Sequence, residues 1–153
     1  MRKMFWLVLL AAALAAPCLS QEGNATSPDF SLTISAPAHI KVGSEVDLTI
    51  KITNTSTHDI DAGSFYADGV DMAYRYELRD SVGNLVRNKH REMIGSIRAK
   101  TLKPGDSAEE KVLISRIADM TRPGQYKLRV SRTVGGPTDG VVKSNEIALT
   151  VTP

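Results

Sequence analysis

The chain has 153 residues, and its 19 lysines and arginines nearly balance 17 aspartates and glutamates, giving a formal net charge of +2 at pH 7. This balance argues against nucleic acid or an acidic membrane as the partner, because those surfaces are bound by a clustered basic excess. The single cysteine excludes a disulfide framework within the chain, and the length suits one domain.

The first twenty residues have the pattern of a secretory signal peptide. Arg2 and Lys3 form a positive start, Met4–Ala16 is an apolar run, and small residues up to Ser20 offer a cleavage site. The run is shorter than the about 20 apolar residues of a bilayer-spanning helix. We therefore expect a secreted or periplasmic protein, with no membrane contact once the leader is removed. The 133 residues that remain of the 153 carry 17 basic and 17 acidic side chains.

The end of this leader allows a second interpretation. Cys18 follows the apolar run, where a lipid-modified cysteine would anchor the protein to a membrane. Lipoprotein signals place a small residue before that cysteine, whereas this chain has Pro17. Removal of Cys18 with the leader is the favoured interpretation. Residues 21–28 are polar and predict a disordered tether, which leaves residues 29–153 as the folded domain.

Period-2 alternation of apolar and polar residues runs through the remaining sequence. The clearest case is Glu45–Thr53, in which Val46, Leu48, Ile50 and Ile52 share one side of the expected strand. Further alternating segments are Phe30–Ser35, Tyr74–Arg79, Val112–Ile114, Tyr126–Ser131 and Ile147–Thr152.

The segments between these expected strands are rich in glycine and proline, as turns are. Asp80–Val86 reads as a hairpin around Gly83 and Asn84. Only Ser115–Thr121 allows a helical turn. The pattern predicts an all-β, antiparallel sandwich.

The segment Asp119–Val130 resembles the E–F corner of immunoglobulin-like domains. Pro123 and Gly124 form a turn that leads into Tyr126, whose hydroxyl in such domains bonds to upstream backbone. Over about residues 30–152 the pattern is similar to immunoglobulin-like domains of secreted bacterial proteins, including the BsuPI-type proteinase inhibitors and the N-terminal β-domain of peptidyl-Lys metallopeptidases. The resemblance implies an immunoglobulin-like antiparallel β-sandwich of about seven strands and carries over no catalytic residue.

Chemistry-bearing residues are scattered along the chain. His39, His58 and His90 are far apart and form no His-Glu-x-x-His motif, and no serine lies in a Gly-x-Ser-x-Gly context. Metal catalysis usually needs clustered ligands. The sequence therefore predicts no enzyme, no catalytic residue, no cofactor and no resident metal.

One expected loop, over residues 59–71, carries two features that leave alternatives open. Phe65 and Tyr66 are candidates for contact with a partner, or for a plug over the end of the core. The loop also contains four aspartates, which read as a solvated polar loop or as oxygen ligands for calcium. These are Asp59, Asp61, Asp68 and Asp71.

These observations favour a non-enzymatic binding or structural module that engages an unidentified protein partner, with its oligomeric state open. Contact would be made through loops at the end of the sandwich or through a strand edge. The alternative is a protease inhibitor of the BsuPI-like type, acting through Gly63–Met72 or Thr133–Val141. Binding of polysaccharide is less favoured, because the only tryptophan, Trp6, lies in the leader.

Overall fold

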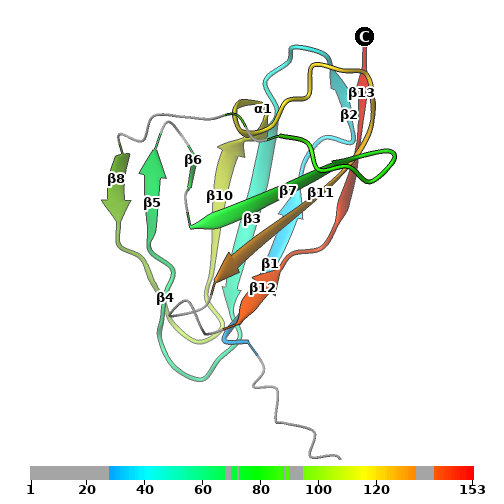
Figure 1. The fold of residues 1–153 in the computed structure, drawn as a ribbon. Helices are drawn as coiled ribbons and strands as arrows, with labels where there is room; N and C mark the ends of the chain where they lie inside the picture. The colour runs from blue at the N-terminus through cyan, green and yellow to red at the C-terminus, as the bar shows by residue number, and fades with distance from the viewer. Residues whose placement is uncertain (1–27, 68–69, 72, 88, 90–94, 134–139) are drawn as a thin grey trace, which may run out of the picture.

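Six long antiparallel strands build the domain in the computed structural model, which describes residues 28–67, 70–71, 73–87, 89, 95–133 and 140–153 (Figure 1). Five of these strands fall where the alternation predicts one, and β10 was indicated only at its C-terminal end. The short segment Val112–Ile114 overlaps only the last two residues of β10, which ends at Leu113, and Ile114 begins a helical turn instead. The six are β1 (Phe30–Ser35), β3 (Asp47–Asn54), β7 (Tyr74–Asp80), β10 (Ser107–Leu113), β11 (Gly124–Thr133) and β13 (Ile147–Thr152).

The strands form two sheets that pack in layers. One sheet has the order β1-β3-β10, and in the other β11 pairs with β7 on one side and with β13 and β12 (Val141–Lys143) on the other. In chain order these are the A-B-E and C-F-G strands of an immunoglobulin domain. Figure 1 shows β7 and β11 running across the strands of the first sheet. The prediction of an immunoglobulin-like sandwich is confirmed.

The chain crosses between the two sheets near its first strand. β1 belongs to the first sheet, whereas the next strand, β2 (His39–Lys41), pairs in parallel with β13 of the second sheet. Asn145 closes part of the free edge of β1, since its Oδ1 accepts from the Ile34 amide at 2.8 Å and its Nδ2 donates to the Ile34 carbonyl at 3.1 Å. This side chain replaces a neighbouring strand at that position, so the edge is not open there.

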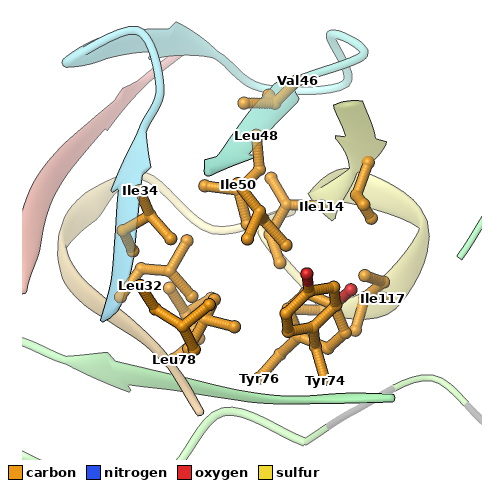
Figure 2. Close-up of a cluster of buried hydrophobic side chains, with 14 of the residues drawn as sticks. Leu32, Ile34, Val46, Leu48, Ile50, Tyr74, Tyr76, Leu78, Ile114 and Ile117 are labelled. Atoms are coloured by element: carbon orange, nitrogen blue, oxygen red, sulfur yellow. The ribbon is translucent and has the colours of Figure 1, made fainter. Parts of the chain in front are cut away.

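The core lies between the inner faces of the two sheets. Leu48, Ile50 and Leu128 are fully buried, at 0% exposure. Figure 2 shows Tyr76 and Leu78 of β7 pointing toward side chains from β1 and β3. The α1 turn (Ile114–Ile117) adds Ile114 and Ile117 to the same cluster. Alternation thus places one face of every long strand in a shared apolar interior.

The connections on either side of β7 contain short strands that the sequence pattern did not indicate. Together with β2 and β12 they raise the number of described strand segments to thirteen. They are β4 (Ile60–Asp61), β5 (Ser64–Ala67), β6 (Val70–Asp71), β8 (Gly95–Arg98) and β9 (Thr101–Leu102). β4 pairs with β9, and β5 pairs with both β6 and β8. These segments are too short to show a period.

The prediction of a loop over residues 59–71 is therefore wrong in part. Phe65 and Tyr66 lie in β5, where they pair with Ile97 and Ser96 of β8. Aromatic residues favour strands, and this preference outweighs the glycine and aspartates around them. No helix in the described residues is long and apolar enough to span a membrane.

Candidate functional site

A tight turn follows β7 and holds two large apolar side chains in solvent. Val82 is 79% exposed and Leu85 is 62% exposed. With Val141 they are the large apolar side chains that stand out from the surface in the described part of the chain. Exposed apolar groups cost solvation free energy, so the presence of Val82 and Leu85 on one short turn is typical of a contact surface.

The Asp80 carboxylate fixes the shape of this turn. Its Oδ1 accepts from the Val82 amide at 3.0 Å and from the Asn84 amide at 2.8 Å, and its Oδ2 accepts from Asn84 Nδ2 at 3.2 Å. The Asp80 carbonyl also accepts from Gly83 N at 3.0 Å, and Gly83 has a φ of +90°, which favours glycine. The predicted hairpin is present and is tightly bonded.

The same bonds set the charge state of Asp80. Partial desolvation raises its pKa, but the hydrogen bonds from the Asn84 backbone and side chain and from the Val82 amide outweigh it, so the pKa lies below its ordinary value. The carboxylate is therefore ionised at neutral pH.

The outer face of the second sheet continues from this turn. Leu85 pairs with Arg79, so the Leu85 side chain lies on the same side of the sheet as Arg79 and its cross-strand neighbour Lys127. Thr133 and Val141 are paired at the far end of this face. We call this surface the charged face, and it comprises Arg75, Glu77, Arg79, Leu85, Lys127, Arg129, Ser131, Val141, Lys143 and the carboxylate of Glu146.

Ion pairs cover the middle of the charged face. Glu146 contacts Lys127 Nζ at 3.3 Å and Arg129 Nη2 at 3.3 Å. Arg79 Nε donates to Glu77 Oε1 at 2.6 Å, and Arg79 Nη1 donates to the Gly83 carbonyl of the turn at 2.8 Å. Arg79 therefore links the turn to the sheet, which places the apolar groups and the charges in one continuous surface.

Two further cations lie at the other end of this face. Arg75 and Lys143 are exposed and both pair with Ser131, one from each side of β11. Neither makes an ion pair with a residue that the structure describes.

The predicted corner lies at the start of β11, in the same sheet. It comprises Pro123, Gly124 and Tyr126. The Tyr126 hydroxyl donates to the Arg122 carbonyl at 2.8 Å, which is the back-bond that the resemblance implied. Burial and the charge of Asp119 raise the pKa of Tyr126. The tyrosine therefore stays protonated and keeps donating at neutral pH.

Sequence reasoning missed a buried arginine on the inner side of β11. Arg132 is 7% exposed, its Nη2 donates to the Gly63 carbonyl at 2.7 Å, and its guanidinium lies 5.3 Å from the centre of the Tyr74 ring. Its signal was available, because Arg132 continues the inward register of Leu128 and Val130. It joins the sandwich to the chain between β4 and β5.

The metal-binding types of side chain do not gather in the described residues. No group of three histidine, cysteine, aspartate or glutamate side chains is present there. Asp61 Oδ1 instead accepts from the Gly63 amide at 2.7 Å. His39 lies in β2 and His58 follows β3, while Asp68 and His90 lie outside the described residues.

The two loops considered for protease inhibition are only partly described. Gly63–Met72 contains β5 and β6, so it is not the single exposed loop that the sequence suggested. Residues 134–139 of the second candidate lie outside the described residues.

The fold and this surface define an immunoglobulin-like β-sandwich. No protein-family model matches the chain, and no curated protein matches it. Among solved structures, a CARDB domain from Pyrococcus furiosus in complex with di-metal ions shares 13% identity at a TM-score of 0.49, covering 82% of this chain and 89% of that one.

Two other solved structures have a similar degree of likeness. The C-terminal domain of Wzt shares 13% identity at a TM-score of 0.48, covering 83% of this chain and 75% of that one. A β-glucosidase from Listeria innocua shares 16% identity at a TM-score of 0.43, with 80% of this chain matched to 16% of the enzyme. The fold assignment therefore rests on this chain's own strand order.

Proposed function

We propose that the chain is an exported, non-enzymatic binding module that engages a protein partner through the turn at the end of β7. The observation that carries this proposal is the pairing of rigidity with exposure, since Asp80 fixes a turn that displays Val82 and Leu85. A turn already held in one shape loses little conformational entropy on binding, so its apolar contacts count more fully toward affinity.

The location of the turn agrees with the expected mode of contact. Loops at the end of a sandwich carry function because a rigid scaffold positions them. The strand-edge alternative has less support at β1, where Asn145 occupies both backbone groups of Ile34. Export remains part of the proposal and rests on the sequence of residues 1–20.

Protease inhibition remains the alternative. It is the activity implied by the resemblance to BsuPI-type inhibitors, and neither of its candidate loops contributes a described contact in its favour. Capture of a protease that persists when the turn is altered would favour this alternative, because its candidate loops lie outside the turn.

The test is capture of partners from envelope and medium fractions by the tagged chain expressed in its source cell. The double variant Val82→Ser, Leu85→Ser should lose the partner, while Glu109→Ser, Lys111→Ser on exposed positions of β10 should retain it. Both variants should keep the unfolding temperature of the parent, because all four side chains are exposed. Equal capture by both variants would contradict the proposal.

A further inference from the structure

We infer that the charged face docks an acidic surface on a protein, and that the apolar turn enters the same partner. This inference rests on the function proposed above and adds the chemistry of the partner. Its starting point is an imbalance of charge. The cations of the face are Arg75, Arg79, Lys127, Arg129 and Lys143, against the carboxylates of Glu77 and Glu146.

This imbalance does not serve the fold. Arg79 and Lys127 lie directly opposite each other on neighbouring strands, where like charges destabilise a sheet. Arg75 and Lys143 flank Ser131 in one row and have no ion pair among the described residues. Exposed cations that the sheet does not neutralise leave a positive potential over the face, which attracts a negative partner.

The two carboxylates indicate which class of acidic partner fits. Glu77 and Glu146 lie on either side of Arg129, in the middle of the face. They would repel the continuous negative charge of a polyanion or an anionic bilayer, whereas a protein surface can place its carboxylates apart, opposite the two cationic ends.

The apolar side chains support the same choice. Leu85 lies beside Arg79 at one end of the face, and Val141 lies beyond Lys143 at the other. Protein interfaces combine apolar contacts with polar and charged ones, so exposed apolar groups at both ends of the face favour a protein over a polyanion.

The experiment is a titration of the purified chain, followed by amide NMR, with a synthetic peptide that carries spaced glutamates around a central leucine. A peptide with glutamine in place of glutamate is the reference probe. We expect shifts in β7, β11, β12 and residues 80–86.

The charge reversal Arg75→Glu, Lys143→Glu should weaken binding about tenfold or more. Raising the salt from about 0.05 M to 0.5 M should weaken it as well, because the Debye length falls.

The matched control reverses the same number of charges on the other sheet. Lys51→Glu, Lys111→Glu lies on the outer side of β3 and β10 and should leave the affinity within about twofold of the parent. Equal weakening by the two reversals, or equal binding of the glutamate and glutamine peptides, would overturn the inference.

Two further arms separate this inference from the function on which it rests. If Val82→Ser, Leu85→Ser abolishes binding while Arg75→Glu, Lys143→Glu does not, the turn is a binding site and the charged face is not. If heparin or phosphatidylglycerol vesicles bind more tightly than the peptide and depend on Arg75 and Lys143, the face recognises a polyanion and the protein-surface inference fails. If both variants bind the peptide as tightly as the parent does, the result contradicts both proposals.

Discussion

The two outer faces of the sandwich differ in chemistry although they share one core. The face of β1, β3 and β10 presents mostly serine and threonine hydroxyls, and its register places Lys51 opposite Glu109 and Thr53 opposite Ser107. Thr53 Oγ1 and Ser107 Oγ lie 2.8 Å apart, and Lys51 Nζ lies 3.9 Å from Glu109 Oε1. These two pairs contact each other across the strands of this face.

The charged face differs in composition and in the pairs that its register brings together. Its register sets Arg79 against Lys127, and Leu85 and Val141 remain exposed at its ends. Arg79 and Lys127 each pair with a glutamate, but their direct opposition is unfavourable, since a sheet prefers opposite charges across its strands. The contrast is the reason for proposing that the charged face, and not the face of β1, β3 and β10, is the one that meets a partner.

The largest expected effect comes from breaking the core that both faces share. Leu128 lies under the charged face and Ile50 lies under the face of β1, β3 and β10. Both side chains are 0% exposed. Leu128→Ala and Ile50→Ala should each lower the free energy of unfolding by about 2–5 kcal/mol, because each removes a buried side chain and leaves a cavity.

Urea unfolding monitored from both sheets tests this shared core. One coincident transition is expected for each variant, since the two sheets bury each other. Separate transitions in tryptophan probes placed on the two outer faces would contradict a single cooperative core. A surface change such as Thr33→Ala should stay within about 0.5 kcal/mol and serves as the control.

A smaller effect should follow from loss of the corner bond beneath the charged face. Tyr126→Phe removes the hydroxyl that donates to Arg122 and leaves the buried ring in place. We expect the free energy of unfolding to fall by about 1 kcal/mol, the usual contribution of such a hydrogen bond. Unchanged urea unfolding would count against a stabilising role for this corner. Tyr76→Phe makes the same change at a second buried tyrosine, in β7, and serves as the comparison.

The sequence allowed five of the six long strands to be predicted, because each buries one side and that burial imposes period-2 alternation. β10 was indicated only at its last two residues. The corner at Tyr126 was predictable for a related reason, since its turn residues are local. β5 and β8 were missed because four residues are too few to display a period. Their pairing depends on segments more than twenty residues apart, which no local pattern reports.

The sequence could predict single residues of the candidate surface, but not how they are arranged relative to one another. Alternation identified Arg79 and Lys127 as outward residues of their strands, but only the register shows that they are neighbours. Asp80–Val86 was recognised as a hairpin, yet the exposure of Val82 follows from the way in which Asp80 folds the turn. Arg132 could have been expected to point inward, but its contact with Gly63 required the structure.

The smallest effect should separate the apolar turn from the charges beside it. The pKa of Asp80 is lowered in the folded chain, so its carboxylate contributes stability above the pKa of the unfolded state and loses it as the pH falls through the folded value. Acidification through the folded pKa of Asp80 should therefore loosen the turn. In an NMR titration the Val82 and Asn84 amides should shift with a midpoint below that of an unfolded aspartate. In Asp80→Asn the same amides should not titrate, because the amide side chain carries no acidic proton, and a midpoint above the ordinary value in the parent would show that Asp80 does not fix the turn as a carboxylate.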